Sequence, residues 1–246
     1  MLPWPWDANF EVNLKRLLTA LCLALLARSS VADQRTANAA LEKASTAFSQ
    51  GKLEEAQKQV DTAVKAGSKK PDVPNLLGAI YTRQKRYQEA IEKFNQALTL
   101  DPKFYPAKLN LAEAKLLEGN YADATLEYQA LKEVDPGSEL VDFKLVLCAL
   151  LSGEVNKASG LVDLMKFPGK TPAYYYARAA IALKRGEKEA ADKYFENVKK
   201  YYTEPRCRYF VQSLKEVDLT SQTPGQPTET PAKPPGKTES SGGGSK

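Results

Sequence analysis

The sequence repeats at an interval of 33 or 34 residues, and this period constrains the fold more than any other feature. An alanine recurs in related contexts ("GKLEEA", "KRYQEA", "GNYADA", "GEVNKA" and "GEKEAA") at Ala56, Ala90, Ala124, Ala158 and Ala191. One helical turn after each alanine stands a larger residue: Val60, Phe94, Tyr128, Val162 and Phe195. Repetition at this period is typical of stacked helix pairs, so we predict an all-α solenoid.

The stretch from residue 71 to 104 shows why one unit is a pair of helices. "PNLLGAIYTRQ" predicts a first helix, and "YQEAIEKFNQAL" predicts a second with an apolar face at helical spacing. We expect Ala90 to be small because the two helices cross closely there, and Phe94 to fill the space beside that crossing. Asp101 and Pro102 end the second helix, since a residue before proline is pushed out of the helical region.

These positions resemble the tetratricopeptide repeat, whose pattern includes Leu-Gly, Tyr, Ala, Phe and Pro at the spacing of Leu77, Gly78, Tyr81, Ala90, Phe94 and Pro102. Pro74 stands where that pattern has tryptophan, Lys115 takes the tyrosine position of the third unit, and the last two units are degenerate. The resemblance implies a right-handed superhelix of antiparallel helix pairs. Its five units are 37–70, 71–104, 105–138, 139–171 and 172–205.

The two ends of the chain differ from the repeats. Lys15 and Arg16 precede an apolar run over 17–27, and small residues before Asp33 predict a secretory signal peptide (1–32) cleaved after Ala32. An uncleaved anchor is the alternative, and translation from Val12 is a further hypothesis. At the other end, 206–219 predicts a capping helix over the last pair, within a solenoid domain of 33–219. Residues 220–246 contain five prolines and no large apolar residue, so we expect them to be disordered, with a tether to a partner or cell-wall polymer as the functional alternative.

Composition narrows the chemistry. The chain has no histidine, which excludes serine–histidine and cysteine–histidine catalysis and histidine-ligated metals. A net charge of +5 over 246 residues is mild and spread along the chain, which argues against nucleic-acid binding. Cys148 and Cys207 are interpreted as apolar side chains in helices, with a disulfide between them as the alternative, and Cys22 lacks the context of a lipidation site. We predict no enzyme activity, no metal and no cofactor.

The resemblance implies that the first helices of the units line a concave surface that binds an extended peptide or a helix of another protein. The residues expected to face this groove are Phe48, Asn75, Arg83, Leu109, Asn110, Glu113, Leu117, Phe143, Lys144, Leu147, Leu151 and Tyr176. Packing against an adjacent helix is the alternative for Phe143, Leu147 and Leu151. Ala79 and Leu140 occupy places where some family members carry polar residues that clamp a carboxylate, so we expect an amphipathic or apolar ligand instead.

The "AYYYARAA" stretch at 173–180 has three consecutive tyrosines. Tyr175 takes the tryptophan position of the repeat and is expected to lie in the core, with an aromatic surface for sugar stacking as the alternative. Together these features predict a non-enzymatic scaffold, exported to the periplasm or cell envelope, that binds another protein. A membrane-anchored assembly factor or a co-chaperone is the alternative, membrane contact requires an uncleaved leader, and the oligomeric state stays open.

Overall fold

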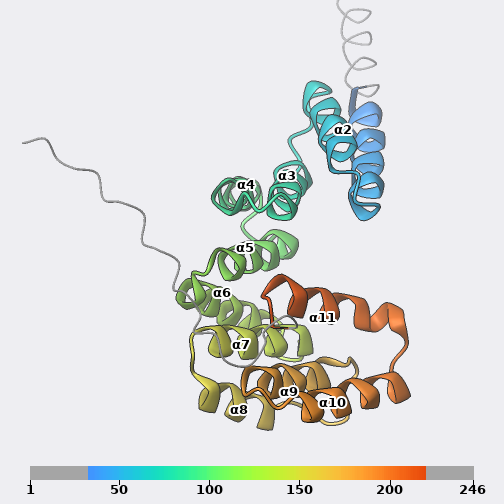
Figure 1. Ribbon diagram of the computed structural model, residues 1–246. Coiled ribbons are helices and arrows are strands. Elements are labelled where there is room, and N and C mark those ends of the chain that lie inside the picture. Colours follow the sequence, from blue (N-terminus) through green and yellow to red (C-terminus); the bar gives the residue numbers. More distant parts are fainter. Residues whose placement is uncertain (1–32, 220–246) are drawn as a thin grey trace, which may run out of the picture.

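The computed structural model describes residues 33–219, and this part of the chain consists of helices and short turns without strands (Figure 1). Helical residues 33–49 come first. They are followed by α2 (Leu53–Lys65), α3 (Asp72–Arg83), α4 (Tyr87–Leu100), α5 (Tyr105–Glu118), α6 (Tyr121–Val134), α7 (Glu139–Leu151), α8 (Val155–Asp163), α9 (Ala173–Lys184), α10 (Lys188–Tyr201) and α11 (Glu204–Glu216). The prediction of an all-α repeat solenoid is confirmed. The predicted leader, Cys22 and the proline-rich tail lie outside the described residues.

Successive helices pack side by side and the array curves, as Figure 1 shows. The first helices of the units, α3, α5, α7 and α9, lie on the inner side of the curve, and α4, α6 and α8 lie on the outer side. The closest pairings are between neighbours in sequence, such as α3 with α4 and α9 with α10. Between residues 33 and 219, none of the helices is both long and apolar enough to cross a membrane.

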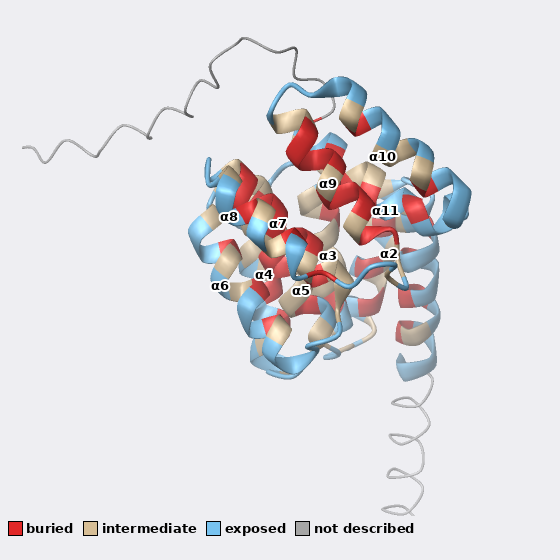
Figure 2. Cartoon of the chain, turned by 90° about the horizontal axis from the view of Figure 1, so that it is seen from below, coloured by how far each residue is buried: buried red, intermediate tan, exposed pale blue. Residues whose placement is uncertain are grey.

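The recurring alanines are where paired helices meet. Ala56, Ala90, Ala124, Ala158 and Ala191 are all completely buried. Gly78 on α3 shows how close the helices come, because a Cβ placed on it would lie 2.5 Å from Cε1 of the Phe94 ring on α4. Figure 2 shows the same pattern along the array, with buried residues on the facing sides of neighbouring helices and exposed ones on the opposite sides. The expectation of small residues at close crossings is therefore met at these positions.

The turn between the two helices of each unit uses a left-handed backbone. Four of the five units place a glycine there: Gly51, Gly119, Gly153 and Gly186, with φ between 76° and 92°. In the second unit the equivalent residue is Lys85, which adopts the same conformation with φ of 60°. A side chain with a Cβ is disfavoured in this region by roughly 1–2 kcal/mol.

Replacing Lys85 by glycine is therefore expected to raise the free energy of unfolding by about 0.5–1 kcal/mol, because glycine adopts positive φ without steric cost. Lys85 is exposed, so little packing is lost. Urea denaturation followed by circular dichroism measures the change. Lys85→Ala is the control and should give no gain, since alanine keeps the Cβ. A Lys85→Gly variant no more stable than the parent would contradict the assignment of strain to this turn.

Helix α11 contacts more of the array than the last helix pair alone. Instead of stacking on the end of the last pair, it lies inside the curve, beside α7 and α9 (Figure 1). Phe210 on α11 packs with Phe143 on α7 and Tyr176 on α9. The helix predicted at 206–219 thus contacts α9 of the last pair, as expected, and in addition packs on α7 of the preceding unit.

The cysteines in the described part of the chain are free. Cys148 lies in α7 and Cys207 in α11, and both are buried. Burial raises the pKa of the Cys148 thiol to about 11, which makes it a poor nucleophile at neutral pH. The interpretation of both residues as small apolar side chains in helices is confirmed over the disulfide alternative.

Candidate partner-binding groove

The concave surface between α5 and α9 holds α11 as an amphipathic helix. Its buried residues, Cys207, Phe210, Ser213 and Leu214, recur at intervals of three and four, which places them on one face. The Phe210 ring stacks on Tyr176 with centroids 5.5 Å apart and meets Phe143 edge-on at 5.1 Å. Arg206, Arg208 and Lys215 lie on the exposed side of the helix. The groove therefore binds this helix through an aromatic centre and leaves its charged face in solvent.

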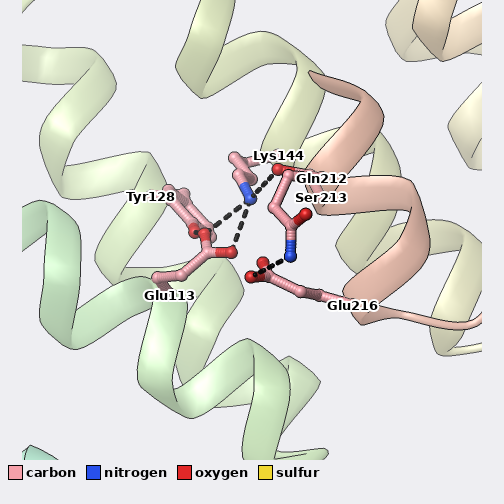
Figure 3. Close-up of polar contacts among 6 residues, drawn as sticks. All are labelled: Glu113, Tyr128, Lys144, Gln212, Ser213 and Glu216. Atoms are coloured by element: carbon pink, nitrogen blue, oxygen red, sulfur yellow. Dashed lines mark hydrogen bonds and ion pairs between the residues drawn. The ribbon is translucent and has the colours of Figure 1, made fainter. Parts of the chain in front are cut away.

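A buried polar network lies beneath α11 (Figure 3). The Lys144 ammonium on α7 is completely buried and contacts the two carboxylate oxygens of Glu113 on α5 at 2.7 and 2.6 Å. It also donates to Oγ of Ser213 on α11 at 2.9 Å. The Tyr128 hydroxyl on α6 donates to Glu113 at 2.7 Å. These bonds join two consecutive repeats to α11, so the groove has a charged and hydrogen-bonded floor as well as an apolar one.

Electrostatics keep the Lys144–Glu113 pair charged. Burial alone lowers the pKa of Lys144, but the nearby Glu113 carboxylate and Tyr209 more than offset this, so its pKa lies above the ordinary value of 10.5. Burial, followed by the Glu113 charge, raises the pKa of Tyr128 well above 10, which keeps its hydroxyl protonated as a donor. A buried ion pair with extra hydrogen bonds of this kind depends on having both partners present.

The stabilisation from Lys144 should therefore be lost only at alkaline pH. A raised pKa in the folded state means that the contribution is fully present below pH 10.5 and disappears as the pH rises through the higher folded value. The contribution of Tyr128 to stability also falls as the pH rises, because the pKa of Tyr128 in the folded state is raised as well. We expect hydrogen exchange of α11 to be constant from about pH 7 to 10, once corrected for intrinsic rates, and to accelerate above that. In Lys144→Met the alkaline step should shrink, and an unchanged step would contradict the assignment.

Four residues predicted to face an open groove do not face solvent. Phe143, Lys144 and Leu147 are completely buried, and Tyr176 is 4% exposed. The cause is α11, which covers the inner faces of α7 and α9. The prediction that they form an open binding surface is therefore wrong for the described chain, although they do contact a helix in the concave surface. Leu151 is half-buried and packs beside the Tyr128 cluster.

The first half of the concave surface differs from the second half because α11 does not reach it (Figure 1). Nδ2 of Asn110 on α5 donates to Oδ1 of Asn75 on α3 at 2.9 Å, and both side chains are half-buried. The Arg83 guanidinium lies over the Phe48 ring, 5.6 Å from its centroid. These four predicted residues lie on three consecutive inner helices. Leu109, Glu113 and Leu117 on α5 are half-buried and lie between the two halves.

A cavity of about 600 Å³ lies beside this open half, between the helix of residues 33–49 and α3. Its lining mixes apolar and polar side chains: Asn38, Leu41, Glu42, Ser45, Thr46, Lys70, Asp72, Asn75 and Leu76. The Asn75–Asn110 bond uses one donor and one acceptor, which leaves the amide nitrogen of Asn75 and the amide oxygen of Asn110 for further hydrogen bonds. Such groups suit the main chain of a peptide.

Sequence reasoning does not identify Ser213, Phe210 and Tyr128 as groove residues. It assigns Tyr128 only to a packing position, and 206–219 only to a cap. The apolar spacing in α11 indicates a buried face, but not the surface against which it is buried. In residues 33–219, no group of three or more histidine, cysteine, aspartate and glutamate side chains is arranged to hold a metal ion.

Comparison with known proteins agrees with this architecture. Tetratricopeptide repeat models match residues 41–103 and 81–142. A tetratricopeptide repeat protein from Parabacteroides merdae has 21% identity and a TM-score of 0.60, with 89% of this chain and 86% of that chain covered. A thermophilic TPR protein from Thermus thermophilus has 16% identity and a TM-score of 0.59, with 76% and 100% covered.

A curated relative shares the repeats within a longer protein. The DnaJ homolog subfamily C member 7 homolog of Dictyostelium discoideum is 23% identical over 165 residues, which cover 60% of this chain and 31% of that protein. The chain thus spans about a third of that relative's length. The repeat period, the buried alanines and the two matching models lead to one conclusion: the chain carries tetratricopeptide repeats, matched by the family models over residues 41–142, and repeats of this family serve as scaffolds for protein–protein interaction.

Proposed function

We propose that this protein is a non-enzymatic scaffold of the cell envelope whose concave surface binds an amphipathic helical segment of a partner protein. The observation that supports it is α11 itself. An amphipathic helix already lies on the inner faces of α7 and α9, with Phe210 between two aromatic rings and Ser213 bonded to Lys144. A helix in a groove is a common mode of peptide recognition, read through anchors three and four residues apart.

The partner segment is proposed to enter through the open half of the groove. There Phe48 and Arg83 offer an aromatic and cationic surface, and Asn75 and Asn110 offer hydrogen bonds to main-chain groups. The exposed rim is both acidic and basic, with Glu42, Lys70 and Asp72 around the same cavity. A segment with one apolar face and a mixed polar face suits this surface better than a carboxylate terminus does.

Export is proposed from the sequence of residues 1–32, with Lys15 and Arg16 ahead of an apolar run and small residues before Asp33. Cell fractionation followed by intact-mass measurement tests it. The expected species is found in the envelope fraction and begins at Asp33. A cytosolic protein that keeps its leader would contradict export, and an envelope protein that keeps its leader would indicate an anchor.

The groove proposal is tested with α11 supplied as a peptide. A full-length variant carrying Phe210→Asp and Leu214→Asp cannot bury its own α11, so its groove should bind a synthetic peptide of residues 203–219 in trans. Wild-type protein should bind the same peptide at least about ten-fold more weakly, because its groove is occupied and the binding-competent state is rare. The matched control is the same peptide with Phe210→Asp, which should bind neither protein.

Fluorescence anisotropy of a labelled peptide measures these affinities, and circular dichroism verifies that the variant keeps its helices. Equal binding of the peptide to wild type and variant would show that it binds elsewhere. A folded variant that does not bind the peptide would refute the helix-binding groove. The open half is tested separately by crosslinking in envelope extract, where Phe48→Asp with Asn110→Asp should lose partners that Leu126→Asp on the outer helix α6 retains.

A further inference from the structure

A second surface of the protein, separate from the concave groove, is rich in aromatic side chains. It is formed by the loop between α8 and α9 (164–172), the start of α9 and the junction of α10 and α11. A concavity of about 940 Å³ there is lined mainly by Phe167, Lys170, Tyr175, Tyr201, Tyr202 and Arg206. Phe167 is 60% exposed and Tyr201 is 67% exposed, although both are large and apolar. Exposed apolar rings gathered at one place indicate an interaction site.

The rings are arranged around a buried one. Tyr175 is 6% exposed and lies between the two exposed rings. Tyr201 is nearly parallel to it, with centroids 6.2 Å apart and planes at 17°, and Phe167 meets it edge-on at 5.9 Å. The expectation that Tyr175 lies in the core is met, since the side chain is buried. Its ring forms the base of this surface. Two ridges flanking an aromatic base make a shallow groove with ring faces available to a ligand.

The loop that carries this surface is held in place before any ligand arrives. The Glu139 carboxylate on α7 accepts from the backbone N–H of Lys170 at 2.7 Å and from the backbone N–H and hydroxyl of Thr171 at 2.7 and 2.5 Å. The Tyr202 hydroxyl donates to the carbonyl of Gly169 at 2.9 Å. A surface ordered in advance loses less conformational entropy on binding.

The polar groups at this surface are suited to a particular ligand. Its charged side chains, Lys170 and Arg206, are both donors, and no carboxylate or carboxamide side chain lines it. A sugar presents hydroxyl donors that need such acceptors. A polyproline II segment instead presents pyrrolidine rings that pack on aromatic faces, and backbone carbonyls without internal partners that accept from lysine, arginine and tyrosine.

We propose that this surface binds the chain's own proline-rich segment, residues 224–235. That segment, "PGQPTETPAKPP", has prolines at 224, 227, 231, 234 and 235, with two PxxP spacings, and carries one acidic and one basic side chain, Glu229 and Lys233. It is also within reach. Tyr202 precedes α11 and Leu219 follows it, so about 20 Å of helix separates them. Twelve residues after Leu219 span roughly 37 Å in polyproline II conformation.

The test uses the full-length chain with a photocrosslinking residue, p-benzoylphenylalanine, in place of Lys170. Lys170 lies on the rim, its side chain is exposed, and only its backbone bonds to Glu139. After irradiation, mass spectrometry maps the crosslinked peptides. We expect crosslinks within one chain to residues 224–235, at a yield independent of protein concentration. The same residue placed at Leu126 on α6 is the background control.

Substitutions in the aromatic surface and in the proline-rich segment provide a second test. Phe167→Ala with Tyr201→Ala, and separately Pro231→Ala with Pro234→Ala and Pro235→Ala, should each lower the crosslink yield at least about five-fold. Ser240→Ala with Ser241→Ala, which lie outside the segment, should not. The aromatic residues are exposed, so these changes leave the fold intact by circular dichroism. Crosslinks that join two chains, crosslinks to other proteins only, or a yield at the Leu126 background would each overturn the proposal.

Discussion

Replacing Glu113 by glutamine is expected to lower the free energy of unfolding by about 3–5 kcal/mol, because it leaves a buried ammonium without its counter-charge. The Lys144 side chain is completely buried, and the Glu113 side chain is 15% exposed. The hydroxyl groups of Ser213 and Tyr128 are uncharged, so their hydrogen bonds cannot take the place of the Glu113 carboxylate. Urea denaturation measures the loss, and hydrogen exchange should show it first in α11, whose Ser213 is bonded to Lys144.

The matched control is Glu89→Gln, which breaks the ion pair between Glu89 on α4 and Arg86, the residue before that helix. Both side chains of that pair are more than 40% exposed, so solvent screens the two charges and the loss of stability should be small. A double variant, Glu113→Leu with Lys144→Met, should recover most of the stability by removing both charges together. If Glu113→Gln costs no more than Glu89→Gln, the pair does not stabilise the groove.

Replacing Phe210 by alanine is expected to cost about 3–5 kcal/mol at most, since it removes a large ring from a buried aromatic cluster. Phe210 is 5% exposed and contacts both Phe143 and Tyr176. The loss is limited by the free energy that holds α11 in the groove, because the helix can leave while the repeats stay folded. Hydrogen exchange over 204–216 should therefore accelerate strongly, with little change in α3 and α4.

Arg208→Ala on the exposed side of the same helix serves as the control and should change the free energy of unfolding by less than about 0.5 kcal/mol. A second prediction separates local from global effects: Phe210→Ala should bind the 203–219 peptide that wild type binds weakly. Acceleration spread evenly over all helices would mean that α11 and the repeats unfold as one unit.

Much of the repeat architecture was predictable because it depends on local spacing. Ala90 and Ala124 mark the helix crossings and are completely buried, and Phe94 and Tyr128 fill the space beside them, as the 34-residue period predicted. Gly78 is small for the same reason, since only a residue without a side chain fits against the Phe94 ring. These contacts lie within one unit or between neighbouring units, and the 34-residue period predicts which residues make them.

The candidate groove was less predictable because its occupant comes from far along the chain. The Lys144–Ser213 bond joins residues 69 apart in sequence, and no local period relates them. Helical spacing assigned Phe143, Lys144 and Tyr176 to the inner face, which is where they lie, but it could not show that α11 covers them. The amphipathic pattern of α11 indicates that one face is buried and leaves its partner surface unspecified.

The hydrogen bonds that the Lys144 ammonium donates determine which helices can take the place of α11. The ammonium gives protons to Glu113 and to the hydroxyl of Ser213. A competitor with an alanine or leucine opposite Lys144 would leave one of these N–H groups without a hydrogen-bond partner in an interface that excludes water, at a cost of about 1–3 kcal/mol, or roughly five- to 150-fold in affinity. A groove that binds a partner helix as proposed would therefore select against helices that are apolar throughout and admit those that carry a hydroxyl, a carboxamide or a carboxylate at that depth.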